Sequence, residues 1–262
     1  MMVMNLRVRE RLDAGQPVLG TFLKINSPAL VELIGLAGFD FVIIDTEHGC
    51  FTHADVENLI RAAEVTGMSA IVRTPDAGDS AILHALDSGA AGVQVPGLSS
   101  AAEAARAARS ARYHPLGQRG FARANRAAGY GAAPLKEYFE RANRMLLAVH
   151  VENREMVEDI EALCALDAVD IVFLGAADLS QSYGVPGEQD SLQVRTALDR
   201  VTSVALAAGR EVGAVAGTAA EMDALVAKGI RYIVWQSDIA MLRGALQAPS
   251  RQFAGYRRDQ GR

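Results

Sequence analysis

The chain has 262 residues, of which half are hydrophobic and 22% are charged, and its net charge is −5 at pH 7. This length is close to the ~250 residues of one α/β barrel, and the composition allows a large buried core. The negative charge argues against a nucleic-acid or anionic-membrane partner, because either would require clustered Lys and Arg side chains. Two cysteines, Cys50 and Cys164, are too few for a disulfide framework and show no metal-ligand spacing.

No targeting or membrane segment is predicted. Residues 1–16 lack the uninterrupted apolar stretch of a signal peptide. No apolar run elsewhere approaches the ~20 residues that a membrane-spanning helix needs. We therefore expect a cytoplasmic protein with reduced cysteines and with neither a membrane nor a nucleic acid as partner.

Eight short apolar runs alternate with longer amphipathic stretches along the chain. The runs are nearly continuous in Val, Ile, Leu, Phe and Ala, which is typical of strands buried on both faces of a parallel sheet. The predicted strands are 18–23, 39–45, 69–73, 92–96, 146–151, 170–174, 211–215 and 231–234. The predicted helices lie near 28–37, 53–66, 78–88, 99–110, 154–164, 190–208, 218–228 and 238–247. Strict alternation predicts a single α/β domain over residues 1–262, a closed (β/α)8 TIM barrel, with an open doubly wound sheet as the alternative.

Two segments fall outside this alternation. Residues 112–134 are rich in Gly and Arg and separate the fourth and fifth strands. Because this connection is long for a barrel, we predict an inserted active-site loop there. The polar C-terminal tail after Pro249 is expected to be partly disordered or to dock on a neighbouring subunit.

Two acidic residues follow neighbouring strands at the end where barrel enzymes carry their active sites. Glu152 ends the fifth predicted strand and Asp178 follows the sixth. Two carboxylates, completed by water and substrate oxygens, suit Mg²⁺ or Mn²⁺. Each acid taken alone could instead cap the helix or turn that follows it. Their occurrence at neighbouring strand ends favours a shared metal ion.

The second and third strands end in further charged residues. His48 is the predicted base, because Asp45 lies three residues before it and could orient the imidazole. A surface-loop histidine is the alternative for this pattern. Arg73 follows Ala-Ile-Val at the end of a buried strand, where its planar cation needs an anion. A substrate carboxylate or a developing enolate oxygen is one candidate partner, and a structural ion pair is the other.

Other catalytic classes find little support in the sequence. Lys24 and Lys136 do not lie inside apolar runs that would lower their pKa values, which disfavours an aldolase of the Schiff-base type. The chain has no G-x-S-x-G, P-loop or dinucleotide-binding glycine pattern, which lowers the expectation of a hydrolase, a kinase or a dehydrogenase.

Several ordered motifs resemble the HpcH/HpaI aldolase family. They are FVIIDTEHGCF, IVRTP, LDSGAAGVQVP, HPLGQRGFARANRAAGYG, VHVEN and LGAADLSQSYGVPG, and the resemblance runs from about Leu19 to Leu246. It implies a (β/α)8 barrel in which Glu152 and Asp178 bind Mg²⁺, Mn²⁺ or Co²⁺. It also implies an Asp45–His48 dyad and an Arg73 that polarises the oxo-acid oxygen.

The resemblance further implies a homo-oligomer, a hexamer built as a trimer of dimers, in which Asp87 reaches a neighbouring subunit's site and residues 115–120 border the pocket. The predicted substrate-binding residues are Arg73, His150, Gly175, Ala176, Ala177 and Ala214.

The chain departs from the family pattern at some of these positions. His150 stands where many members have Gln, and it could ligate the metal, act as a second acid or base, or hydrogen-bond the substrate. Ala176 replaces the usual Pro of the family's Gly-Pro-x-Asp-Leu-Ser segment. Trp235 and Gln236 replace small residues near the eighth strand and could narrow the barrel mouth. These changes bear on the substrate more than on the reaction type.

The sequence therefore predicts a class II aldolase, which makes or breaks a carbon–carbon bond between pyruvate, or a similar 2-oxo acid, and an aldehyde through a metal-stabilised enolate. A lyase for an acyl-CoA or a dicarboxylate, related to the citrate-lyase β chain, is the first alternative. It would need positive charge for a CoA tail, for which the Arg-rich residues 112–126 are the only candidate. A non-catalytic protein that binds oxo acids is the second alternative.

Overall fold

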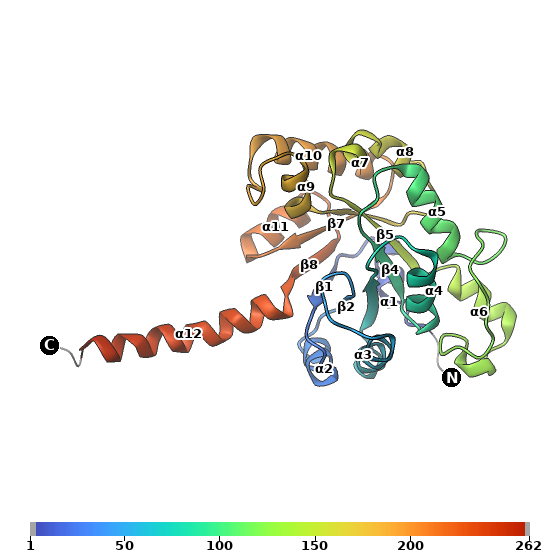
Figure 1. The fold of residues 1–262 in the computed structure, drawn as a ribbon, viewed down its shortest axis with the longest axis horizontal. Coiled ribbons are helices and arrows are strands. Elements are labelled where there is room, and N and C mark those ends of the chain that lie inside the picture. Colours follow the sequence, from blue (N-terminus) through green and yellow to red (C-terminus); the bar gives the residue numbers. More distant parts are fainter. Residues whose placement is uncertain (1–3, 260–262) are drawn as a thin grey trace.

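The computed structural model describes residues 4–259, which form a closed barrel of eight parallel strands in sequence order (Figure 1). Strand β1 pairs with both β2 and β8, so the sheet has no edge. This confirms the predicted (β/α)8 TIM barrel and excludes the open sheet. The strands are β1 Val18–Leu23, β2 Phe41–Asp45, β3 Ser69–Arg73, β4 Gly92–Val95, β5 Leu146–Val151, β6 Ile171–Leu174, β7 Glu211–Ala216 and β8 Tyr232–Ser237.

Helices surround the barrel and overlap every helix that the sequence predicts. The expected helix over 154–164 is divided into two at Asp159, and three short helices (α1, α6 and α9) were not predicted. The helices are α1 Arg7–Asp13, α2 Pro28–Leu36, α3 His53–Val65, α4 Asp79–Asp87, α5 Ala101–Ala111, the 3-10 turn η1 Gly129–Gly131, α6 Leu135–Ala142, α7 Arg154–Glu158, α8 Ile160–Cys164, α9 Ala176–Ser182, α10 Leu192–Ala207, α11 Ala219–Ala227 and α12 Asp238–Asp259.

Two apolar clusters hold the barrel together. The larger one lies between the strands and the helices, and the smaller one fills the barrel interior. In the interior, the rings of Phe41 and Tyr232 stack with their centroids 4.3 Å apart, and Phe173 meets Tyr232 edge-on. Each strand is buried on both faces, which explains why the strands are continuous apolar runs in the sequence.

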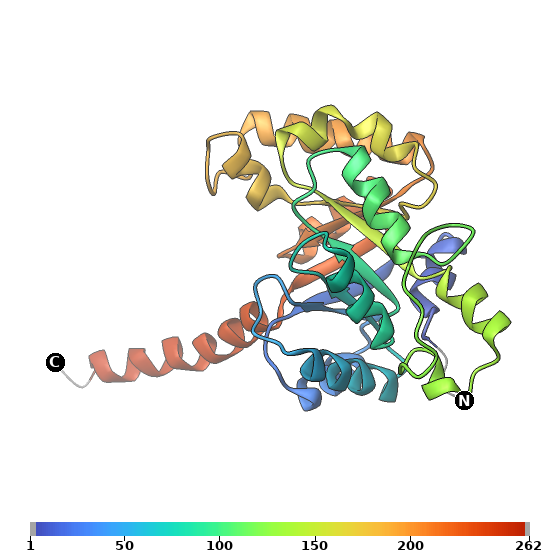
Figure 2. The same cartoon turned by 45° about the vertical axis from the view of Figure 1, so that its right-hand side comes forward.

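The last helix, α12, runs away from the barrel instead of packing along it (Figures 1 and 2). It continues to Asp259, well past the predicted end at residue 247. Pro249 removes one backbone hydrogen bond, but its neighbours are mostly good helix formers, so the helix persists. The expected disordered tail is therefore helical as far as Asp259, and residues 260–262 lie outside the described part.

The long connection over 112–134 lies at the amino-terminal end of the strands. The Arg112 guanidinium donates to Asp170, which directly precedes β6, over 3.1 Å. The Tyr113 N–H donates to Asn143, shortly before β5, over 2.7 Å. A connection that follows a helix starts at the end of the barrel opposite to the strands' carboxyl ends. The loop therefore does not border this chain's own mouth, contrary to the sequence-based expectation.

Candidate active site

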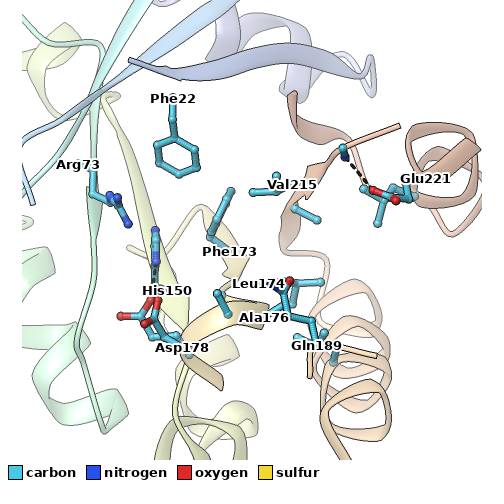
Figure 3. Close-up of a pocket in the computed structure, with 17 residues that line it drawn as sticks. Phe22, Arg73, His150, Phe173, Leu174, Ala176, Asp178, Gln189, Val215 and Glu221 are labelled. Carbon is cyan, nitrogen blue, oxygen red and sulfur yellow. Dashed lines mark hydrogen bonds and ion pairs between the residues drawn. The ribbon is translucent and has the colours of Figure 1, made fainter. Parts of the chain in front are cut away.

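A cavity of about 510 Å³ opens at the carboxyl ends of the strands (Figure 3). One side, which we call the charged half, is built on β2 to β5 and presents Arg73, His150 and Glu152 to the cavity. Asp45 and Gln94 are fully buried and contact Arg73 and His150. The other side, which we call the apolar half, is built on β6, β7 and β1 and carries Phe173, Val215 and Phe22. The first turn of α9, with Asp178, lies over the boundary between the two halves.

The charged half is organised around a buried ion pair. Asp45 and Arg73 face each other in the register of β2 and β3. The Arg73 Nε and Nη2 atoms donate to the two Asp45 carboxylate oxygens over 2.8 and 2.6 Å. Burial raises the pKa of Asp45, but the hydrogen bonds and charge of Arg73 outweigh it, so that the pKa lies below its usual value. The Lys24 ammonium, 3.3 Å from the same carboxylate, adds to this effect.

A second carboxylate, from Glu47, closes the other side of Arg73. Its Oε2 atom lies 2.8 Å from Arg73 Nη1. Burial raises the pKa of Glu47, and the charge of Arg73 only partly offsets that rise. The Arg73 guanidinium also lies over the Phe22 ring, 4.8 Å from its centroid. Glu47 is not among the predicted site residues, although its spacing of two residues from Asp45 could have indicated a shared face.

His48 lies at the exposed rim of the charged half. Its side chain is 55% exposed, and its Nε2 atom is 3.8 Å from Glu47 Oε2. The backbone N–H of His48, and not its ring, donates to Asp45 over 3.2 Å. The carboxylate of Asp45 is thus oriented by Arg73, because the strand register places Arg73 directly opposite. This arrangement differs from the expected orientation of the His48 ring by Asp45.

Glu152 is held at the end of β5 by a hydrogen bond to each carboxylate oxygen. The Gly97 N–H donates to Oε1 over 2.6 Å, and His150 Nδ1 lies 2.8 Å from Oε2. Burial raises the pKa of Glu152, but the hydrogen bonds from His150 and from the Gly97 N–H outweigh it, so the pKa is lowered. A Cβ atom on Gly175 would lie 2.5 Å from the Glu152 Cβ, so glycine allows the loop before α9 to approach Glu152 closely.

Asp178 lies on the first turn of α9 and is exposed to the cavity. Its side chain has no hydrogen-bond or ion-pair partner among residues 4–259. Neither acid caps the following helix: Asn153 caps α7 through its side chain, and Gly175 occupies the cap position of α9. The capping alternative for Glu152 and Asp178 is therefore not what the structure shows.

The donor set fits a hard divalent cation. Glu152 and Asp178 line one cavity, Glu152 is held in its ionised form, and Asp178 has no protein partner. Within the described part of the chain, no three His, Cys, Asp or Glu side chains form a metal cluster, so water and substrate oxygens would complete the coordination. The charged half and Asp178 together have an excess of carboxylates, because the two cations Lys24 and Arg73 face the four acids Asp45, Glu47, Glu152 and Asp178.

The remaining predicted residues fall into two places. Gly175, Ala176, Ala177 and Ala214 line the cavity, as the sequence analysis expected for a substrate pocket. Asp87 instead ends α4 at the opposite end of the barrel, where it accepts a 2.6 Å hydrogen bond from Arg119. Asp87 is therefore not part of this chain's own cavity.

No helix in the described residues is both long and apolar enough to cross a membrane.

Comparisons with known proteins agree with this geometry. A hydroxypyruvate/pyruvate aldolase from Paraburkholderia phytofirmans is 33% identical over 92% of this chain and 95% of its own length. A 2-dehydro-3,6-dideoxy-6-sulfogluconate aldolase from Pseudomonas putida is 32% identical over 86% of this chain and 88% of its own. A crystal structure of an HpcH/HpaI aldolase/citrate lyase family protein from Burkholderia cenocepacia superposes with a TM-score of 0.89 at 30% identity, covering 94% of this chain and 98% of that one.

These relatives are aldolases, which are carbon–carbon lyases, and this chain is an enzyme of the same reaction class. The family model of the HpcH/HpaI aldolase/citrate lyase family matches residues 19–245, which run from the second residue of β1 to beyond the end of β8. From this match and the identity to its relatives, the chain belongs to the HpcH/HpaI aldolase/citrate lyase family.

Proposed function

We propose that the chain is a metal-dependent aldolase that splits or forms the carbon–carbon bond between pyruvate, or a similar 2-oxo acid, and an aldehyde. The observation that carries this proposal is the convergence of Glu152 and Asp178 on one cavity beside Arg73. The name of the relative from P. phytofirmans adds hydroxypyruvate to the candidate donors.

Glu152 and Asp178 would hold the cation, which we propose to be Mg²⁺, Mn²⁺ or Co²⁺. When bound, such a cation supplies Lewis-acid stabilisation of a 2-oxo-acid enolate. Arg73 adds positive charge at the same edge of the cavity, and its clamps to Asp45 and Glu47 fix its orientation before substrate arrives. Val215 and Phe173 form an apolar surface for the methyl end of the donor.

His48 is the base that we propose for the proton transfer. In the cleavage direction it takes the proton from the 4-hydroxyl group. The bond between C3 and C4 then breaks, its electron pair passes into the enolate of the donor, and the aldehyde leaves. The enolate carbon finally takes up a proton. The exposed position of His48 at the rim, 3.8 Å from Glu47, leaves its ring free to reach the acceptor end of the substrate.

An assay of pyruvate release from 4-hydroxy-2-oxo acids tests this function. We expect turnover that EDTA removes and that Mg²⁺, Mn²⁺ or Co²⁺ restores. Cleavage of malyl-CoA or citramalyl-CoA, measured in parallel, tests the alternative of an acyl-CoA lyase. Release of pyruvate that survives both EDTA and the Glu152→Ala substitution would contradict the metal-dependent scheme.

We also propose that the protein is a homo-oligomer in which α12 packs on a second copy of the chain. Ile239, Leu242 and Leu246 recur at helical spacing on α12, and their side chains are 47%, 39% and 70% exposed. A groove of about 410 Å³, lined by residues such as Leu19 and Ile233, lies beside α11. An α12 from a second copy is a suitable occupant for this apolar groove.

The mass of the particle, measured by light scattering, tests this assembly. We expect the double substitution Leu242→Glu and Leu246→Glu to reduce the mass, whereas Gln247→Glu on the same helix should not. A monomeric wild-type protein would contradict the proposal. Asp87 and residues 112–134 could serve a second subunit's site in a larger assembly, such as the hexamer, built as a trimer of dimers, that the family resemblance implies.

A further inference from the structure

We propose that His150 is a positioning residue that holds Glu152 in place through a hydrogen bond donated by its Nδ1 atom, and that it binds neither the cation nor the substrate. His150 stands where the family resemblance expects glutamine. The claim that His150 affects cation binding rests on the proposed function, whereas the hydrogen bonds of its ring do not depend on that function.

A line of hydrogen bonds crosses the barrel from its core to the charged half. The Tyr232 hydroxyl lies 3.5 Å from Gln94 Oε1, and Gln94 Nε2 lies 2.6 Å from His150 Nε2. His150 Nδ1 in turn lies 2.8 Å from Glu152 Oε2. Tyr232, Gln94 and His150 come from β8, β4 and β5, Glu152 directly follows β5, and all four are buried. The line therefore connects the proposed cation ligand to a rigid part of the interior.

The chemistry of the donors and acceptors fixes one consistent direction for this line. An amide nitrogen only donates, so His150 Nε2 accepts from Gln94 and carries no proton. The ring proton is then on Nδ1 and is donated to the carboxylate of Glu152, which only accepts. Gln94 Oε1 is left to accept from Tyr232. Each polar group of the line has a partner that suits it.

The environment of the ring leaves His150 no free nitrogen. Both ring nitrogens are engaged, and one face of the ring stacks on Phe173 with the centroids 4.7 Å apart. The residue is 2% exposed. His150 therefore contributes a fixed ring to the cavity wall and has no lone pair to offer to a cation or to a substrate oxygen.

The consequence for Glu152 is a fixed carboxylate. His150 holds one oxygen and the Gly97 N–H holds the other, so the remaining lone pair of each oxygen is available to a cation. Partners of this kind orient metal ligands, and their loss costs about 10–100-fold in metal affinity. A residue that only filled space at position 150 would have no such effect.

The tautomer can be read by nitrogen NMR on protein that carries ¹⁵N-labelled histidine. The chain has five histidines, so a spectrum of His150→Gln identifies the signals of His150 by their absence. We expect a proton-bearing Nδ1 and a proton-free Nε2, in metal-free protein. A proton on Nε2 alone, or on both nitrogens, would overturn the proposed direction of the line. This measurement does not depend on catalysis or on the cation.

Binding of Mn²⁺, measured by electron paramagnetic resonance, tests the positioning. We expect His150→Ala to raise the Kd about 10–100-fold. His150→Gln, whose amide can still donate to Glu152, should stay within about threefold of wild type, and His84→Ala on α4 should leave the Kd unchanged. Thermal unfolding of each variant identifies any that fail to fold, and His150→Gln is the variant that keeps the test valid in that case.

The Mn²⁺ affinities of wild type and His150→Ala distinguish a failure of the positioning role from a failure of the proposed cation site. Equal Mn²⁺ affinity for wild type and a folded His150→Ala variant would overturn the positioning role while leaving the aldolase proposal intact. A wild-type protein without Mn²⁺ affinity would overturn the proposed cation site, and the NMR result would then decide the hydrogen-bond line by itself.

Discussion

The two halves of the barrel mouth are built on the same fold but differ in polarity: one holds hydrogen-bonded charges and the other presents apolar side chains. In the charged half, the acids of β2 and β5 receive hydrogen bonds from Arg73, His150 or a backbone N–H. In the apolar half, Phe22 and Phe173 meet edge-on with their centroids 6.1 Å apart and carry no charge to the cavity. The buried charges at this mouth therefore lie where Arg73, His150 or a backbone N–H supplies a partner.

Asp178 is the exception to this rule. It lies between the two halves and has no partner within residues 4–259. An unpartnered acid beside a firmly held one is the arrangement expected where an exogenous cation completes the charge balance.

The largest effect is expected when Glu152 is changed to Gln. The amide keeps the volume but loses the charge, so we expect metal-dependent kcat to fall by about 10³-fold or more, as the loss of several kcal/mol of stabilisation implies. Glu221→Gln is the matched control, because Glu221 lines the same cavity from α11. Steady-state kinetics at saturating Mn²⁺ measures both. Similar losses in the two variants would remove the distinction between the halves.

Loss of the buried partner of Arg73 should mainly affect stability. We expect Asp45→Ala to lower the free energy of unfolding by about 3–5 kcal/mol, because it leaves a buried guanidinium with a single carboxylate partner. Urea denaturation measures this change. A loss below about 1 kcal/mol would mean that the ion pair behaves like an exposed one.

The same ion pair predicts a dependence on pH. Folding lowers the pKa of Asp45 from its usual 3.8, so its contribution to stability is present above that value and is lost as the pH falls through the lower, folded value. Wild type should therefore lose unfolding free energy below about pH 4 more steeply than Asp45→Asn. Parallel curves for the two proteins would contradict the assignment.

A smaller effect is expected for Arg73→Lys. An ammonium cannot reproduce the paired hydrogen bonds to Asp45 together with the contact to Glu47. We expect kcat to fall about 10²-fold with a smaller change in Mn²⁺ affinity. Single-turnover kinetics separates the chemical step from binding. An unchanged kcat would show that charge alone, without the planar geometry, suffices.

The smallest effect is expected in the apolar half. Val215 is 46% exposed at the mouth, so Val215→Ala removes little buried surface. We expect a loss of stability below about 1 kcal/mol and a change in the KM for pyruvate of only a few-fold. A loss of kcat comparable to that of Arg73→Lys would instead place the chemistry in both halves.

The sequence predicts the barrel and the strand ends well because both follow from local patterns. Continuous apolar runs mark the strands, and the polar residue that ends each run must lie at the mouth, as with Arg73 and Glu152. The strand register is not a local property. Nothing in the sequence indicates that Arg73 faces Asp45, which takes this carboxylate away from the His48 ring.

Other features depend on tertiary packing. Residues 112–134 looked like an active-site loop by length and composition, yet their position after α5 places them at the far end of the barrel. The direction of α12 cannot be derived from its own residues, because only packing decides whether a helix lies along the barrel. The line from Tyr232 to Glu152 joins residues that are far apart in sequence, and only Gln94 stood out as a polar residue in an apolar strand.

Exchange of the methyl protons of pyruvate for deuterium tests the central claim most directly, because it detects enolate formation without a known aldehyde. In D₂O with Mn²⁺, we predict exchange that proton NMR can follow and that EDTA abolishes. Glu152→Gln should lose it, and Glu221→Gln should retain it. Exchange that continues at the wild-type rate in Glu152→Gln would contradict the account.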